Sequence, residues 1–412
     1  SLIGKWHFPV TMPADENRLP TRRGFEYYYG LAAGCCNYFN PAKPFPDNYG
    51  GQGPEPFLNQ EAPVTEFPPD YYTTDDFTDH AIKQIEKFTG AKDKSPFFLN
   101  LCYTAPHYPL HAKPQDIAKY KGRYDDGYFA LRKQRQQRLV ELSLIHPMWR
   151  LSEPDSMAGE SRYDFAIAPW EQIEDVTRER RRMEVYAAMV DALDQGIGRV
   201  LDALARTGAA NNTLVMFLSD NGGCAGYADH HDTELPGSID TFDYVAQGWG
   251  WAQNAPFRRY KTWTHEGGIS TPMIARWPSV IEPNTLTSQV GHVVDFMPTV
   301  LEISAAGYPA KRNDVAVLPA EGLSLVPVFE GRERAGHNAL CWYLYGNRAV
   351  RQGKWKLVWG DNVQQWELFD MELDRTETND LAAQFPERVQ QMEADWLQWA
   401  KETGTPLKGS GL

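Results

Sequence analysis

The fold is decided by the stretch Thr213-Leu-Val-Met-Phe-Leu-Ser-Asp220-Asn-Gly-Gly223, which joins an apolar run to a polar cluster. The run predicts a buried strand, and in an open α/β sheet ligands bind just beyond the carboxyl ends of the strands. Asp220 and Asn221 offer the hard oxygens that calcium or magnesium requires, and the two glycines let the backbone approach an anion closely. Because Asp-Asn-Gly is also an ordinary turn, the stretch alone leaves both a metal site and a turn open.

The segments around this stretch predict an α/β protein with a mostly parallel central sheet sandwiched by helices. Residues 180–206 carry one apolar stripe at helical spacing directly before the stretch. Residues 95–103 form another apolar strand, which we expect to be covered on both faces. A helix followed by an apolar strand is the unit of a parallel sheet with helical layers. Residues 120–170 are charged and lack periodicity, so we expect a surface insertion there.

The C-terminal part of the chain has a different pattern. Short strands between residues 341 and 370, joined by turns that contain glycine, predict an antiparallel meander. A helix is expected from Pro386 to just before Gly404. We therefore predict two domains, an α/β domain at residues 1–334 and a smaller α+β subdomain at residues 335–412.

Composition narrows the classes of partner. The 412 residues carry a net charge of −13, which argues against broad nucleic-acid binding. No apolar run is long enough to span a bilayer. The five cysteines show no zinc-binding spacing. An acidic protein that binds an anionic substrate needs a local cationic pocket to overcome the overall repulsion.

Two short motifs place cations or imidazoles at the ends of predicted strands. In Gly4-Lys-Trp-His7, Lys5 and His7 are two residues apart and point the same way in an extended segment. In Thr104-Ala-Pro-His-Tyr-Pro109, two prolines fix the direction of His107, which suits proton transfer to a leaving group. The alternative for each motif is a surface lysine or a packed or solvated histidine. His111 lies outside the rigid turn, and we expect it to face solvent.

A third motif supplies local positive charge before another strand. It is Arg258-Arg-Tyr-Lys261-Thr-Trp-Thr-His265-Glu-Gly-Gly268. Lys261 would bind an anionic oxygen as a point charge. His265 is either a further donor to that oxygen or a packed side chain. The alternative for the whole motif is a solvated basic run.

Taken in order along the chain, the four motifs resemble those of the sulfatase family, in the arylsulfatase-like branch of the alkaline phosphatase superfamily. The resemblance covers nearly the whole chain outside residues 120–170. It implies the sulfatase fold, with residues 1–334 as an N-terminally incomplete catalytic domain. It also implies hydrolysis of an aryl or carbohydrate sulfate ester, with Ca²⁺ as the cofactor and Mg²⁺ as the alternative.

The resemblance also implies a role for each matching residue. Asp220 and Asn221 match part of the calcium site. Lys5 and Lys261 match the lysines that hold the sulfate oxygens, and His265 is a further candidate for substrate binding. Two histidines have catalytic roles in this scheme: His107 at the leaving-group oxygen and His7 in turnover of the covalent sulfo-enzyme.

The chain departs from the family pattern at the nucleophile. Sulfatases use a formylglycine made within Cys/Ser-x-Pro-x-Arg, N-terminal to the Gly-Lys-x-His motif, and no such motif precedes Lys5. None of the five cysteines lies in one. We therefore expect the formylglycine in a missing N-terminal segment, so that the chain alone is inactive and an N-terminal fragment is a possible partner. A degenerate homologue is the alternative.

Two other functions remain open. One is a phosphomonoester or phosphodiester hydrolase of the same superfamily, and the other is a non-catalytic homologue that binds sulfate. The expected partner is a small-molecule or carbohydrate sulfate ester, with neither nucleic acid nor a membrane span involved. The resemblance implies a periplasmic or secreted location, or a lysosomal one in a eukaryote.

Overall fold

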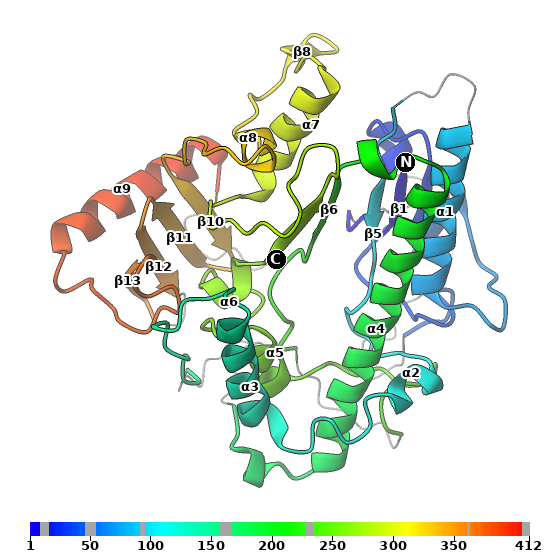
Figure 1. The fold of residues 1–412 in the computed structure, drawn as a ribbon. Coiled ribbons are helices and arrows are strands. Elements are labelled where there is room, and N and C mark those ends of the chain that lie inside the picture. The colour runs from blue at the N-terminus through cyan, green and yellow to red at the C-terminus, as the bar shows by residue number, and fades with distance from the viewer. Residues whose placement is uncertain are drawn as a thin grey trace. The chain divides into compact units, whose positions relative to one another are not determined.

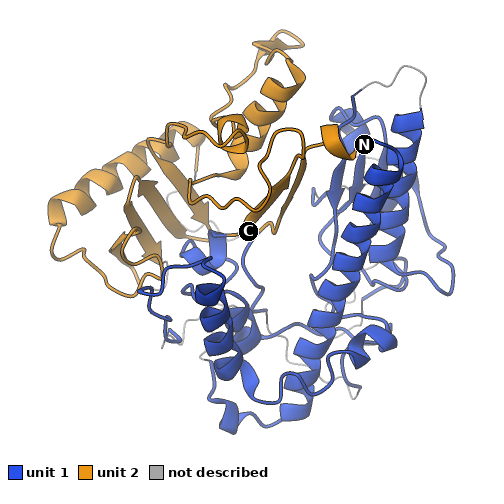
Figure 2. Cartoon of the chain, viewed as in Figure 1, with its two compact units in different colours: residues 1–209, 221–270 blue, residues 210–220, 271–412 orange. Residues whose placement is uncertain are grey.

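The chain forms two compact units, residues 1–209 with 221–270 and residues 210–220 with 271–412 (Figure 2). The domain division at residues 334 and 335 stays a prediction. The computed structural model describes residues 1–8, 16–45, 55–90, 96–155, 167–226, 234–360 and 363–405.

The first unit contains a five-stranded sheet with the order β4-β3-β2-β1-β5, of which Figure 1 labels β1 and β5. Strand β1 (Leu2–Gly4) pairs in parallel with β2 (Tyr28–Leu31) on one side and with β5 (Asn100–Cys102) on the other. Strands β3 (Phe57–Asn59) and β4 (Ala62–Pro63) continue the sheet in antiparallel pairing. The expected α/β class is confirmed, with the parallel pairs at the middle of the sheet.

Two long helices pack on each other along this sheet. Helix α1 (Thr73–Gly90) contacts both β1 and β2, and α4 (Val176–Arg206) lies against α1 (Figure 1). Asp175 caps the first turn of α4 by accepting a hydrogen bond from Arg178 N–H. A Cβ at Gly196 would lie 2.6 Å from Thr78 Oγ1, so this glycine permits the close approach of the helices.

The remaining helices of this unit are short, apart from α3, which has fifteen residues. Helix α3 overturns our expectation of an irregular insertion at residues 120–170. The sequence of α3 is mostly polar, so its helical stripe is weak, but Tyr128 and Arg132 on it are buried. The bounds are α2 (Pro114–Ala118), α3 (Gly127–Glu141), α5 (Gln247–Gln253) and α6 (Glu266–Ile269), with 3-10 turns η1 (Glu16–Arg18), η2 (Pro20–Arg22) and η4 (Trp170–Gln172).

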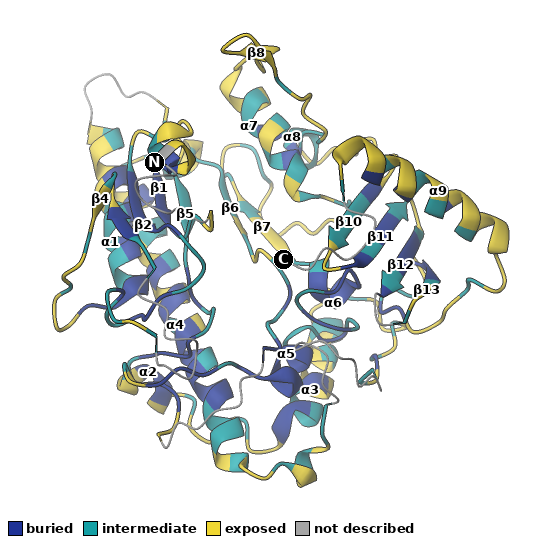
Figure 3. Cartoon of the chain, turned by 180° about the vertical axis from the view of Figure 1, so that it is seen from behind, coloured by how far each residue is buried: buried dark blue, intermediate teal, exposed yellow. Residues whose placement is uncertain are grey.

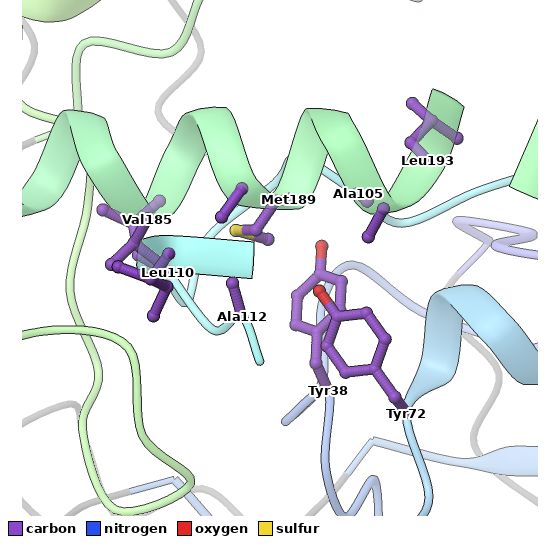
Figure 4. Close-up of a cluster of buried hydrophobic side chains, with 11 residues drawn as sticks. Tyr38, Tyr72, Ala105, Leu110, Ala112, Val185, Met189 and Leu193 are labelled. Atoms are coloured by element: carbon purple, nitrogen blue, oxygen red, sulfur yellow. The ribbon is translucent and has the colours of Figure 1, made fainter. Parts of the chain in front are cut away.

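A buried hydrophobic cluster anchors the loop that follows β5 to α4 (Figure 4). Ala105 and Leu110, on either side of His107, are 7% and 1% exposed. They belong to the same cluster as Val185 and Met189 of α4. Burial of apolar side chains on both sides of His107 stabilises this loop by the hydrophobic effect. The backbone that carries His107 is therefore anchored to α4.

The second unit contains an antiparallel sheet in the order β10-β11-β12-β13, as expected for the C-terminal meander. Helix α9 (Pro386–Thr403) covers it and ends at Gly404, whose φ of +69° suits a left-handed cap. The Lys356 ammonium and the Glu377 carboxylate form a fully buried ion pair of 2.8 Å in this unit. The strands are β10 (Leu340–Leu344), β11 (Asn347–Gln352), β12 (Trp355–Gly360) and β13 (Gln365–Asp370).

The strand predicted from residues 213–218 lies in this second unit. Strand β6 (Val215–Leu218) pairs with β7 (Met273–Arg276) in antiparallel fashion. Our expectation of a buried strand in a parallel sheet is wrong for the described residues, because β6 pairs antiparallel and Phe217 on it is 43% exposed. Figure 3 colours β6 and β7 as intermediate or exposed. Within the described part of this unit, β7 is the one strand paired with β6.

Smaller elements complete the second unit. Its remaining elements are η5 (Ala210–Asn212), η6 (Val293–Asp295), α7 (Phe296–Ser304), β8 (Lys311–Arg312), β9 (Val315–Ala316) and α8 (Val326–Phe329). Arg334 and His337 both contact the buried carboxylate of Asp295, with 2.8 Å between the paired atoms in each case. None of the helices among the described residues has the length and apolar character needed to cross a bilayer.

His111 does not face solvent as we expected, because it is only 1% exposed. Its Nε2 lies 2.6 Å from the carbonyl oxygen of Thr241, and its Nδ1 accepts a hydrogen bond from Tyr38 N–H at 3.3 Å. A carbonyl oxygen only accepts, so Nε2 carries the proton of a neutral ring. Burial lowers the pKa of His111 to about 4.

We expect the free energy of unfolding to fall as the pH decreases from about 6.5 towards 4. In this window the unfolded chain binds a proton at His111 that the folded chain does not, so stability drops by up to about 1.4 kcal/mol per pH unit. Urea unfolding of His111→Gln between pH 7 and pH 4 should show a shallower pH dependence than the parent. The exposed His146→Gln is the matched control. Equal slopes for His111→Gln and the parent would contradict the assignment.

Candidate active site

Lys5 and His7 leave the sheet at the carboxyl end of β1. Lys5 N–H donates to the carbonyl oxygen of Cys102 on β5 at 2.8 Å, which fixes the start of this segment. Gly4 has φ +104°, and a Cβ there would lie 1.9 Å from the same carbonyl oxygen. Glycine is therefore required where β1 passes β5. His7 follows in a left-handed conformation, with φ +63°.

The loop after β5 presents His107 at the same edge of the sheet. Its backbone is held by Tyr38, whose hydroxyl donates to the His107 carbonyl oxygen at 2.9 Å. His107 Nδ1 lies 2.9 Å from the carbonyl oxygen of Tyr108. That oxygen can only accept, so in the neutral ring Nδ1 carries the proton and Nε2 has the lone pair.

Lys261 is tied to the Asp-Asn-Gly-Gly segment through the backbone. Lys261 N–H donates to Gly223 O at 3.0 Å, and Gly222 N–H donates to Gly268 O at 3.1 Å. A Cβ at Gly222 would lie 1.8 Å from Gly267 O, so only glycine permits this approach. The segment that follows β6 and the Lys261 segment therefore hold each other in place.

The electrostatics of His107 show that the predicted cations converge. Burial, followed by the charges of Lys5 and Lys261, lowers the pKa of His107 to about 3, and His7 contributes in the same direction. The structure thus brings Lys5, His7, His107 and Lys261 together, and we call these four residues the cationic site. Their catalytic roles stay predictions.

Sequence reasoning missed Cys35 at this site. The charges of Lys5 and Lys261 act on the Cys35 thiol, whose pKa burial nevertheless raises to about 11. A Cβ on the neighbouring Gly34 would lie 3.7 Å from His7 Nε2, which places this turn beside the cationic site. Only the fold brings Cys35 here, since no local pattern marks it.

His265 lies next to the cationic site in the sequence but inside the protein. It is fully buried at the start of α6, and its ring meets the Trp263 ring in a T-shaped contact at 6.2 Å. The packed alternative therefore describes its environment. Substrate binding by His265 stays a prediction.

Asp220 and Asn221 fit calcium in kind, because both offer hard oxygen donors. Asp220 is exposed, and Asn221 donates from Nδ2 to Gly222 O at 2.8 Å. Calcium takes about six to eight oxygens, and no group of three or more His, Cys, Asp or Glu residues suited to a metal occurs in the described part of the chain. The two residues would thus supply part of a site, and metal binding stays a prediction.

Comparisons with known proteins identify the family. The Sulfatase model matches residues 1–306, and a model of the C-terminal region of N-sulphoglucosamine sulphohydrolase matches residues 257–399. An uncharacterised sulfatase of Schizosaccharomyces pombe is 32% identical over 98% of this chain and 74% of its own length. An arylsulfatase of Klebsiella aerogenes is 28% identical over 81% of this chain and 71% of its own length.

A solved structure has the same fold. The complex of Ps i-CgsB with k-i-k-neocarrahexaose superposes with a TM-score of 0.64 and 24% identity. The match covers 97% of this chain and 70% of that one. With two family models and relatives matched along most of its length, the chain belongs to the sulfatase family.

Proposed function

We propose that this chain binds the sulfate group of an aryl or carbohydrate ester at the cationic site and takes part in its hydrolysis. The proposal depends on one observation, the convergence of Lys5 and Lys261 on His107 in a protein with a net charge of −13. Membership of the sulfatase family supports sulfate ester hydrolysis. The carbohydrate in the Ps i-CgsB complex supports a sugar sulfate as one substrate class.

The residues of the cationic site divide the work by their chemistry. The Lys5 and Lys261 ammonium groups would bind the sulfate oxygens as point charges. Negative charge grows on these oxygens as the ester bond breaks, and the two cations would stabilise it. His107 would give a proton from Nε2 to the departing oxygen. His7 would assist the later turnover step.

Protonation of His107 is linked to substrate binding. Without an anion, burial and then the neighbouring ammonium groups lower the pKa of His107 and favour the neutral ring. A bound sulfate offsets those positive charges and favours the imidazolium, which raises the pKa. His107 would therefore become an acid only when a sulfate group is present.

Two groups beyond the cationic site belong to the proposal. Calcium held by oxygens of Asp220 and Asn221 would supply further positive charge to the sulfate group. The 412 residues contain no Cys/Ser-x-Pro-x-Arg motif, so a formylglycine nucleophile would have to be supplied to them. An N-terminal fragment is therefore a proposed partner.

We expect saturating inorganic sulfate to raise the pKa of His107 from about 3 towards its ordinary value. A histidine ¹³C–¹H NMR titration with and without sulfate measures this shift, and His107→Gln assigns the resonance. Sodium chloride at equal ionic strength is the control for screening. An unchanged His107 titration in saturating sulfate would contradict the proposed site.

We expect Lys261→Ala to lower kcat/KM of the full-length enzyme for an aryl sulfate by about 10²–10³. His107→Ala should cost about 10²–10⁴ with a poor leaving group and less with a nitrophenol, which needs no proton. The exposed Lys121→Ala is the control. Unaltered kinetics in both site variants would remove these assignments, and a preference for the matching aryl phosphate would favour a phosphoester hydrolase.

We expect the 412-residue polypeptide alone to bind inorganic sulfate without hydrolysing an aryl sulfate. Calorimetry reports the binding, and release of nitrophenol reports the turnover. Steady turnover by the purified polypeptide would contradict the proposed external nucleophile. Binding without turnover by the intact gene product would instead favour a non-catalytic homologue.

A further inference from the structure

Residues 120–155, the first part of the predicted insertion at residues 120–170, are joined to the segment that carries Lys261. Arg132 of α3 is fully buried and donates to the carbonyl oxygens of Trp251 at 2.6 Å, Pro256 at 3.0 Å and Phe257 at 2.7 Å, and to that of Ser152 at 3.4 Å. Its guanidinium also lies 4.1 Å from the centre of the Trp251 ring. Removal of Arg132 would leave these buried carbonyl oxygens without this donor, so the helix anchors the chain four residues before Lys261.

The segment after α3 runs beside the same residues. Ser152 Oγ donates to Phe257 O at 3.2 Å. Asp155 Oδ1 then accepts from Arg258 Nε at 2.8 Å and lies 2.6 Å from Arg258 Nη2. Asp155 Oδ2 forms an ion pair with Arg259 Nε at 2.9 Å. One carboxylate thus holds two consecutive guanidinium groups.

These ion pairs are well shielded from water. The side chain of Asp155 is 18% exposed, and those of Arg258 and Arg259 are 16% and 2% exposed. Arg259 is further fixed by stacking, with its guanidinium 3.8 Å from the centre of the Trp263 ring. Screening by salt weakens such partly buried pairs much less than surface pairs.

The backbone around Lys261 needs such support. Arg259 has φ +67° and Thr262 has φ +83°. A positive φ is uncommon for any residue with a side chain, and for β-branched threonine it is a genuine outlier. Conformations of this kind persist only where surrounding contacts enforce them. The clamp on Arg259, formed by Asp155 and Trp263, acts on one of these two positions.

We propose that Asp155 is a positioning residue for Lys261. By binding Arg258 and Arg259 it holds the backbone of residues 259–262 in the conformation that directs the Lys261 ammonium towards His107. The inference rests on the proposed function and deepens it, because it makes the insertion part of the sulfate site. Asp155 itself does not touch the substrate in this scheme.

A double-mutant cycle in the full-length enzyme tests the proposal. Asp155→Asn should lower kcat/KM for an aryl sulfate and weaken the binding of inorganic sulfate, each by about tenfold. In the Lys261→Ala background the same change should cost almost nothing, because the group it positions is gone. Asp155→Glu keeps the charge and should recover part of the loss.

The control is Glu141→Gln on α3. It removes an exposed ion pair with Arg138 of 3.1 Å in the same insertion and should leave kcat/KM unchanged in both backgrounds. If Asp155→Asn does not fold, Arg258→Gln removes one of the two pairs. It should give a smaller loss that also disappears in the Lys261→Ala background.

The outcomes separate the two proposals. An equal fold loss from Asp155→Asn in both backgrounds, or no loss in the parent, overturns the positioning role while the proposed function stands. Unaltered activity of Lys261→Ala contradicts the proposed function and this inference with it. A loss confined to the background that contains Lys261 supports the positioning role.

Discussion

The site depends on holding like charges together. Two ammonium groups act on one imidazole, and their mutual repulsion opposes folding. Neutral main-chain hydrogen bonds oppose that repulsion: Lys5 N–H to Cys102 O, and Lys261 N–H to Gly223 O. An anion that enters the site relieves the repulsion, so the same arrangement that costs stability favours the binding of an anion.

Glycine makes this arrangement possible. At Gly4, Gly222 and Gly268 a Cβ would lie within 2.0 Å of a backbone oxygen. At each position the chain passes a neighbouring backbone closely enough for a main-chain hydrogen bond to form nearby. The glycines in the motifs therefore serve packing of the backbone that carries the lysines, in addition to any approach to an anion.

Features that depend on a short stretch of sequence could be predicted from that stretch alone. Lys5, His7, His107 and Lys261 each follow or precede a strand within a short motif, and the structure brings them together. Apolar stripes at helical spacing also predict α4 and α9. Short strands joined by glycine-containing turns predict the C-terminal meander, which the structure confirms.

Features that depend on distant partners were missed. Buried His111 contacts the carbonyl oxygen of Thr241, which is 130 residues away in the sequence. The residues next to His111 in the sequence therefore could not reveal its environment. Asp155 meets Arg258 across 103 residues, and α3 is too polar for its apolar stripe to stand out. The partner of β6 is likewise β7, more than fifty residues later, and it pairs antiparallel rather than parallel.

The basic run before α6 shows why residue type matters as much as charge. Arg258 and Arg259 present planar forks, which suit a carboxylate on one side and, for Arg259, an aromatic face on the other. Lys261 has no such fork and acts as a compact point charge, which suits an oxygen of a tetrahedral anion. The arginines are thus committed to structure by Asp155 and Trp263, and the lysine is left to act on His107. The contacts of each side chain therefore divide this basic run into arginines that support the backbone and a lysine that is the proposed binding residue.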